Sequence, residues 1–286
     1  MYDIVTVTVN YKMKDKVLAM LRSLFRDTEN RDISNFAAQN LETSLFPRVQ
    51  SVVVDNDSRD SIKDALVKEF SQRIIFIDAG ANIGFGRGNN LALKKFEAKY
   101  YFIANPDLVF MENQPDTVAR LYKFMEDNPK IGIVAPRLVL KSGVTQPSCM
   151  RFPRFFDQPI YRLGLHKKYE WARRRVEWLL MKDFDHTKSQ PIDWATGAAF
   201  FVRGDMLKKV GFFDERYFMY FEDCDLCRTF WSRGWPVYYK GDIVIQHGHE
   251  RASAKVPGLK SILLNPLTRI HLKSLVKYAW KWRGRN

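Results

Sequence analysis

The sequence predicts an α/β fold in which a mostly parallel sheet is flanked by helices. Two observations predict this class: short apolar runs alternate with helical patterns through the first half of the chain, and polar motifs follow the apolar runs. A third observation concerns the size of the core: 286 residues with 46% hydrophobic content can bury a substantial one. This length suits one large domain or two small ones.

Apolar runs and amphipathic stretches succeed each other in a regular order. The predicted strands cover residues 4–9, 52–55, 74–77, 100–104 and 131–134, and a later buried strand covers 193–202. The predicted helices cover residues 14–25, 61–70, 88–96 and 115–127, while residues 27–47 resemble an inserted polar loop. We expect a catalytic domain over residues 1–255, with a basic helical insertion at about 151–190, and a tail over residues 256–286.

Polar side chains cluster where the first four strands are predicted to end. Ligands of parallel sheets bind beyond the carboxyl ends of the strands, so these positions form the candidate site. They are Val9 and Asn10 after the first strand, Asp55 and Asp57 after the second, residues 78–90 after the third, and Asn105 and Asp107 after the fourth.

A glycine-rich segment at residues 80–90 leads into a predicted helix. Its backbone amides are suited to approach phosphates, and Arg87 offers a planar guanidinium. The glycine spacing matches neither the dinucleotide fingerprint nor the G-x-x-x-x-G-K-[ST] loop. An ordinary glycine turn remains the alternative.

Asp107 and His247 are the candidate metal ligands. A carboxylate after a strand can hold Mg²⁺ or Mn²⁺ and leave positions for a substrate diphosphate. The alternative for residues 105–107 is an Asx-Pro turn. His247 directly follows an apolar strand and is a better candidate than His249, although a lone histidine is commonly structural.

Three acids, Glu222, Asp223 and Asp225, follow the aromatic residues 217–221. Carboxylates pressed against apolar neighbours have shifted ionisation, which suits a general base. A helix start is the alternative, because acids in a first turn interact favourably with the helix dipole, and the two interpretations are compatible.

The cysteine pattern and the absence of long apolar runs indicate where in the cell the protein is expected to be. Cys149, Cys224 and Cys227 form no disulfide framework, and the Cys-x-x-Cys pair has no zinc-finger partners, so we expect packing residues in a reducing environment. No run reaches the ~18 apolar residues of a membrane span. We therefore expect a cytoplasmic protein or one attached to a membrane surface.

The net charge of +14 is local. Residues 151–190 hold ten Lys/Arg and five Asp/Glu, and residues 251–286 hold nine Lys/Arg and no Asp/Glu, so these two segments carry the whole excess of positive charge.

The pattern of residues 266–282 predicts an amphipathic helix that lies on an anionic membrane, with its aromatic residues at headgroup level. A tail helix docked on the catalytic domain is the alternative. The predicted basic stripe is Arg269, Lys273, Lys277 and Lys281, and the apolar side is Leu267, Leu275, Tyr278, Ala279 and Trp282.

Together these motifs resemble family-2 glycosyltransferases of the GT-A fold, and within them the bacterial rhamnosyltransferases of O-antigen and cell-wall assembly. The resemblance covers about residues 3–250 and is carried by residues 9–11, 54–58, 82–86, 88–90, 105–107, 194–198, 211–215, 218–226 and His247. Asn105-Pro106-Asp107 stands where the family usually has Asp-x-Asp, which leaves Asp107 as the main protein charge on a metal.

The resemblance implies a nucleotide-sugar donor over the strand ends and inversion in one displacement. Asp223 matches the catalytic base, and Glu222 would orient the acceptor together with Trp194, Thr196 and Gly197. The donor-binding residues would be Val9, Asn10, Asp55, Asp57, Asn82, Gly84, Arg87, Asn89 and Asn105. The branch suggests dTDP-L-rhamnose as donor and polyprenyl-diphosphate N-acetylglucosamine as acceptor, at the inner face of the cell membrane.

Two other functions compete with this one. A family-2 transferase could use UDP-galactose, UDP-glucose or another donor. A basic nucleic-acid-binding protein is the distant alternative, disfavoured because the core is neutral and carries no nucleic-acid motif.

Overall fold

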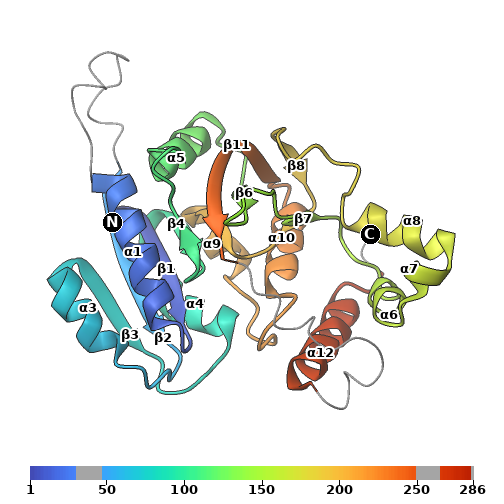
Figure 1. The fold of residues 1–286 in the computed structure, drawn as a ribbon, viewed down its shortest axis with the longest axis horizontal. Coiled ribbons are helices and arrows are strands. Elements are labelled where there is room, and N and C mark those ends of the chain that lie inside the picture. The colour runs from blue at the N-terminus through green and yellow to red at the C-terminus, as the bar shows by residue number, and fades with distance from the viewer. Residues whose placement is uncertain (30–46, 249–264, 285–286) are drawn as a thin grey trace.

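A mixed sheet of nine strands crosses the centre of the molecule, as the computed structural model describes it for residues 1–29, 47–248 and 265–284 (Figure 1). The strand order is β3-β2-β1-β4-β10-β6-β11-β5, and β8 pairs with β11. The first four strands run parallel. They are β1 (Tyr2–Asn10), β2 (Val49–Asp55), β3 (Ile74–Asp78) and β4 (Ala98–Ala104).

The second half of the sheet contains an inserted antiparallel strand. β10 (Ala199–Arg203) lies between β4 and β6 (Ile133–Val139) and is antiparallel to both. β11 (Val237–His247) then runs parallel to β6, and the short β5 (Leu108–Val109) and β8 (Gln190–Ile192) pair with it in antiparallel fashion. β7 (Cys149–Met150) and β9 (Trp194–Ala195) form a separate small ladder.

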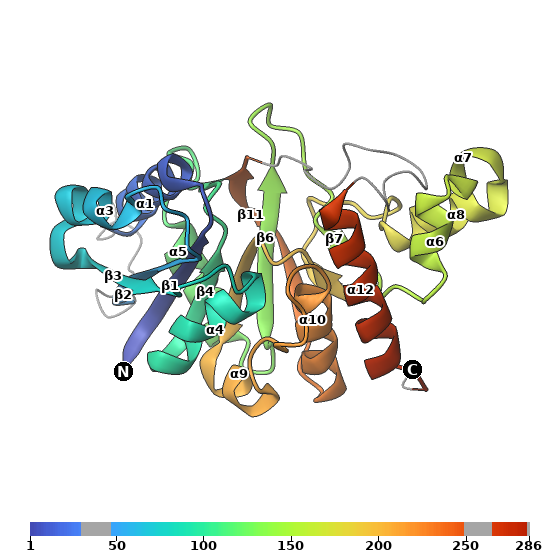
Figure 2. The same ribbon diagram turned by 90° about the horizontal axis from the view of Figure 1, so that it is seen from below.

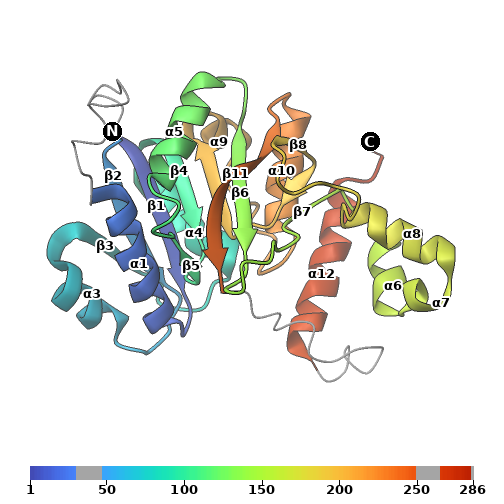
Figure 3. The same cartoon turned by 45° about the horizontal axis from the view of Figure 1, so that its top comes forward.

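Helices cover both faces of the sheet, as the strand–helix alternation predicts. One apolar core joins the sheet to α1 (Lys14–Glu29), α3 (Ile62–Phe70) and α5 (Thr117–Asp127). The opposite core joins it to α4 (Phe85–Lys95), α9 (Gly204–Val210) and α10 (Glu222–Ser232). Figure 3 shows α1 and α5 in front of the sheet and α4 and α9 behind it. The 3₁₀ turn η2 (Ser71–Arg73) leads from α3 into β3.

The predicted fold class is confirmed, and most predicted elements occur close to their expected places. Two predictions were wrong in detail. The strand expected at 131–134 is β6, which begins at Ile133, and the strand expected at 193–202 is broken into β9 and β10. Thr196 and Gly197 lie in that break, where their backbone N–H groups are bonded outside the sheet, to Ser148 O and Asp223 Oδ2. Most of the loop expected at 27–47 and the expected domain boundary at 255/256 lie outside the described residues.

Three helices lie within the basic segment at residues 151–190. It contains α6 (Asp157–Arg162), α7 (Leu165–Lys168) and α8 (Glu170–Leu179), and in Figures 1 and 3 it lies at the same end of the molecule as α12 (Pro266–Lys281). In the described ranges, no helix is both long enough and apolar enough to cross a bilayer.

The C-terminal helix packs on the rest of the described structure, alongside α10 (Figure 2). Leu275, Tyr278 and Trp282, which the sequence assigned to a membrane-facing side, are buried against Tyr217 and Phe221. Lys277 and Lys281 of the predicted basic stripe bond to the domain instead of pointing outward. The prediction of an apolar side for lipid was therefore wrong, because this side completes the protein core.

Candidate active site

One edge of the sheet gathers the predicted site residues. The carboxyl ends of β1, β2, β3, β4, β6 and β11 all lie there, because these strands are parallel. β10 is antiparallel, so its beginning lies at the same edge and its preceding residue reaches the end of β4: Asn105 N–H donates to Ala198 O at 2.8 Å. The edge thus places Asn105, Gly197 and the acidic start of α10 next to one another.

Asp107 and His247 lie side by side because β5 and β11 pair with His247 opposite Leu108. The Asp107 Oδ1 to His247 Nε2 distance is 3.2 Å, and the two side chains are only 13% and 6% exposed. His247 Nδ1 lies 2.8 Å from Gln146 Oε1, a contact that fixes the orientation of the ring. Burial opposes ionisation of Asp107, but the hydrogen bond and charge of His247 lower the pKa of this carboxyl.

This pair suits a divalent cation. His247 Nε2 and Asp107 Oδ1 face each other at 3.2 Å, so both atoms could become ligands of one cation. One imidazole and one carboxylate leave most of a coordination sphere for other ligands. Over the described part of the chain, no group of three or more His, Cys, Asp or Glu side chains is placed to hold a metal, so a bound substrate would have to complete the sphere.

Asp223 lies in the first turn of α10 and is held by two backbone amides. Gly197 N–H donates to Oδ2 at 3.0 Å and Cys224 N–H donates to Oδ1 at 2.8 Å. Each carboxylate oxygen keeps a second lone pair, so the group can still accept a proton. Burial raises the pKa of Asp223, and the two amide hydrogen bonds act in the opposite direction. A fixed, partly buried carboxylate with a raised pKa has the properties of a general base.

The two neighbouring acids differ from Asp223. Glu222 is buried, and its Oε2 has no hydrogen-bond partner in the structure. Burial together with the charges of Asp223 and Asp225 raises the pKa of Glu222 well above its usual value, so the protonated form, a hydrogen-bond donor, is favoured. Asp225 is turned away from the edge and bonds to Lys281 and Trp282, which excludes it as a substitute base.

Asn10 serves Asp55 rather than a ligand. Its Nδ2 donates to Asp55 Oδ1 at 2.8 Å and to Ser58 Oγ at 2.8 Å, and its side chain is fully buried. Asp55 also accepts from Ser58 N–H and is 8% exposed, so the network fixes this carboxylate at the end of β2. Asp57 has a φ of 58° and bonds to Arg59 at 3.0 Å on the protein surface. The Asn10 amide is therefore used within the protein, and Asp57 is more exposed than Asp55.

The glycine-rich segment is an N-cap loop rather than a generic turn. Asn82 Oδ1 accepts from Gly84 N–H, and Gly84, with a φ of 88°, is the N-cap residue that precedes α4. A Cβ on Gly84 would lie 2.0 Å from Phe218 O, so only glycine fits. Phe218 O also accepts from Phe85 N–H at 3.1 Å, which ties this loop to the residues before Glu222.

Several predicted contact residues are used inside the protein. Asn89 Nδ2 donates to Phe85 O in its own helix, Arg87 Nε donates to Glu215 O, and Val9 packs beside Gly88. Trp194 Nε1 donates to Arg151 O. The Nδ2 of Asn89, the Nε of Arg87 and the Nε1 of Trp194 thus already have partners within the protein, whereas Asn89 Oδ1 is buried without one. Thr196 Oγ1 is buried without a partner, at the position where an acceptor was predicted to bind.

Sequence reasoning did not identify three contacts at the site, although Asn90 and Phe218 lie in segments that it singled out. Gln146 orients His247, Asn90 bonds to both backbone groups of Phe213, and the backbone of Phe218 closes on Gly84. The Asn89-Asn90 pair was a visible signal for the second of these. The other two depend on residues more than 100 positions apart, which no local pattern reveals.

Gly84→Ala should destabilise the protein more than Gly80→Ala. Both glycines have positive φ, but a Cβ on Gly80 would meet nothing within 4 Å. We expect Gly80→Ala to lower the free energy of unfolding by about 1–2 kcal/mol through backbone strain alone. Gly84→Ala should cost at least about twice as much because of the added overlap with Phe218 O. Urea denaturation measures both, and equal losses would contradict the predicted closure.

Comparisons with known proteins identify the family of the chain. The model of glycosyl transferase family 2 matches residues 3–209. The N-acetylglucosaminyl-diphospho-decaprenol L-rhamnosyltransferase of Mycobacterium tuberculosis is 25% identical over 249 residues, covering 82% of this chain and 78% of that protein. Rhamnosyltransferase WbbL of Escherichia coli is 26% identical over 244 residues, covering 81% and 83%.

Solved structures support the fold. The mannosyltransferase PcManGT of Pyrobaculum calidifontis, determined with GDP-Man and Mn²⁺, has a TM-score of 0.55 at 14% identity and covers 98% of this chain and 72% of its own. TarS 1–349 of S. aureus has a TM-score of 0.51 at 13% identity, with 86% of this chain covered, and this chain spans 60% of that structure. Because the family model matches most of the chain, the protein belongs to glycosyltransferase family 2.

Proposed function

We propose that the protein is an inverting glycosyltransferase that moves L-rhamnose from dTDP-L-rhamnose to a polyprenyl-diphosphate N-acetylglucosamine acceptor. Membership of glycosyltransferase family 2 establishes the class of enzyme. The two rhamnosyltransferase relatives support the donor, and the name of the mycobacterial relative supports the acceptor. The single observation that carries the mechanism is the common sheet edge, where Asp223 and the Asp107–His247 pair both lie.

In the proposed reaction Asp223 takes the proton of the attacking acceptor hydroxyl. The amides of Gly197 and Cys224 hold the carboxylate in one orientation, which reduces the ordering needed before reaction. The protonated form of Glu222 would donate to an acceptor oxygen. Asp55 and Asp57 would contact the nucleoside, and the amides at the start of α4 would face the diphosphate.

Asp107 and His247 are the residues that would hold Mg²⁺ or Mn²⁺. Such a cation neutralises charge on a departing nucleoside diphosphate. The lowered pKa of Asp107 favours this role, because the carboxyl is ionised at neutral pH.

The exposed surface at the end of the molecule near α12 supports attachment to an anionic membrane. The outward face of α12 carries Arg269 and Lys273 together with Trp280, which is 61% exposed, and Arg283, just after the helix, lies over the Trp280 ring. The α6–α8 insertion adds Phe156 and Trp171, which are 69% and 58% exposed. Basic residues with aromatic neighbours suit the headgroup region, where a lipid-linked acceptor is presented. This arrangement would place the protein on the inner face of the cell membrane.

Asp223→Asn tests the base. Positioned base catalysis typically contributes 10²–10⁴-fold, or about 3–5 kcal/mol in activation free energy, so the transfer rate should fall by at least two orders of magnitude. The rate is measured with dTDP-L-rhamnose and a short-chain lipid acceptor, with UDP-galactose and UDP-glucose as competing donors. The control is Asp205→Asn, a carboxylate exposed to solvent on α9. Near-normal turnover in Asp223→Asn with intact fold would reject the assignment.

Vesicle co-sedimentation tests the membrane face. Replacing Arg269, Lys273 and Arg283 by Gln should weaken binding to anionic vesicles by about 3 kcal/mol, roughly a hundredfold, since each basic residue contributes about 1 kcal/mol. The matched control replaces Lys68, Lys95 and Lys130, exposed residues of other surfaces, by Gln. Equal binding of the two triple variants, or equal binding to neutral vesicles, would contradict the proposal.

A further inference from the structure

Asp225 holds the C-terminal helix to the helix that carries the catalytic base. Its carboxylate is only 2% exposed and accepts from three groups. Lys281 Nζ lies 2.6 Å from Oδ2, and Trp282 Nε1 and the Tyr217 hydroxyl lie 2.7 Å and 3.2 Å from Oδ1. Lys281 Nζ also bonds to Asp214 at 2.9 Å. A buried carboxylate needs such a set of donors to stay ionised, so the contact is specific rather than a chance surface pair.

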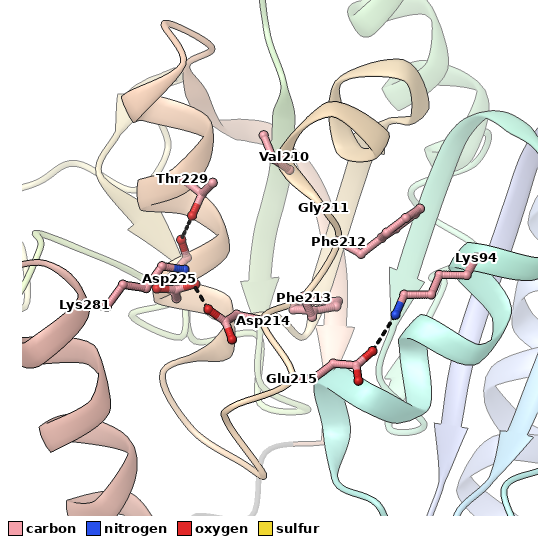
Figure 4. Close-up of a pocket in the computed structure, with 10 residues that line it drawn as sticks. All are labelled: Lys94, Val210, Gly211, Phe212, Phe213, Asp214, Glu215, Asp225, Thr229 and Lys281. Carbon is pink, nitrogen blue, oxygen red and sulfur yellow. Dashed lines mark hydrogen bonds and ion pairs between the residues drawn. The ribbon is translucent and has the colours of Figure 1, made fainter.

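A cavity of about 330 Å³ lies beside the ion pair of Lys281 with Asp225. Figure 4 shows the lysine extending from α12 toward Asp225 on α10 and Asp214 on the preceding loop. The cavity is lined by α4, α10, α12 and residues 210–215, and it contains none of the residues that we assign to donor, metal or acceptor. The Lys281–Asp225 pair therefore holds α12, α10 and the preceding loop together and does not contact the proposed substrate site.

The same helix holds the loop that precedes the base. Ser274 Oγ donates to Met219 O at 2.9 Å, and Lys277 Nζ donates to Arg216 O at 2.6 Å. The His271 ring lies 5.0 Å from the Tyr220 ring and 5.2 Å from the Phe221 ring.

Tyr220 and Phe221 both have a φ of 70°, and they directly precede Glu222. Two consecutive aromatic residues in the left-handed region are sterically unfavourable, so packing from outside has to maintain them. The buried side of α12 supplies that packing, because Phe221 also lies against Tyr278, with ring centroids 5.2 Å apart.

The opposite side of this loop contacts the predicted donor site. Phe218 O accepts from Phe85 N–H, and Arg87 Nε donates to Glu215 O. The loop at residues 214–221 thus spans from α12 to the start of α4, and its last residue leads directly into α10. A shift of α12 would move this loop and, with it, Asp223, because Phe221 continues directly into α10, whereas the start of α4 is tied to the loop only by hydrogen bonds.

We propose that α12 is a positioning element of the active site, with Lys281 and Trp282 as positioning residues that act through Asp225 and residues 214–221 on Asp223. The inference rests on the proposed role of Asp223 as base and adds that the tail helix is needed to present it. A single rigid unit results, in which the helix proposed to face the membrane also fixes the catalytic carboxylate.

Steady-state kinetics of Lys281→Met tests this inference. We expect kcat to fall at least tenfold while the KM for the nucleotide sugar changes less than about threefold, because the base is displaced more than the donor contacts. Lys281→Arg, which keeps a cation at Asp225, should retain at least a third of the wild-type kcat. The control is Lys209→Met, which removes an exposed lysine from an ion pair with Asp205 and should leave both constants unchanged.

Trp282→Phe gives a second variant if Lys281→Met does not fold. It keeps an aromatic ring in the core and removes only the Nε1 donor to Asp225, and it should reduce kcat in the same direction. The inference is overturned if folded Lys281→Met or Trp282→Phe has wild-type kcat, or if Lys281→Arg loses as much as Lys281→Met.

Combination with Asp223→Asn separates this inference from the proposed function. If Lys281 acts through the base, adding Lys281→Met to Asp223→Asn should lower the residual rate by less than twofold. A full further tenfold loss would show a general structural role and overturn the inference. If Asp223→Asn alone has a normal rate, the proposed base is wrong. If only Asp223→Asn is impaired, the base stands and the positioning role fails.

Discussion

The antiparallel strand β10 is the constraint on which the site depends. It lies between two strands that run the other way, so the residues before it, and not those after it, reach the ligand-binding edge. Ala198 O then accepts from Asn105 N–H, and Gly197 N–H donates to Asp223. The break between β9 and β10 therefore connects the end of β4 to the start of α10. Asn105 and Asp223, the residues joined in this way, are 118 positions apart in the sequence.

Electrostatics divides the carboxylates at this edge into two kinds. His247 lowers the pKa of Asp107 despite burial, whereas burial dominates at Asp223 and raises its pKa. A carboxylate that stays ionised suits a cation, and one with a raised pKa suits proton transfer, so the opposite shifts match the two proposed roles. Asp225, only two residues after Asp223, is buried in an ion pair with the partly exposed Lys281 and is structural. Residue type alone does not distinguish the three.

Local sequence patterns predicted the parallel strands, their covering helices and the polar edge, because periodicity and strand-end chemistry act over a few residues. They also identified Asp107, His247 and Asp223 as candidates. They did not reveal that Asn10 supports Asp55, that Gln146 orients His247, or that the buried side of α12 completes a protein core. These features depend on tertiary contacts between distant segments, and an amphipathic helix presents the same pattern whether protein or lipid covers its apolar side.

The central claim is that one edge of the sheet carries two separate functions: Asp107 and His247 bind a cation, and Asp223 acts as the general base. Electron paramagnetic resonance of Mn²⁺, recorded with protein and dTDP, tests it most directly, because the signal of free Mn²⁺ decreases when the ion is bound. Asp107→Asn should lose Mn²⁺ binding, whereas Asp223→Asn should bind Mn²⁺ as the wild type does while transferring sugar at least a hundredfold more slowly. Wild-type binding by Asp107→Asn, or loss of binding in Asp223→Asn, would contradict the account.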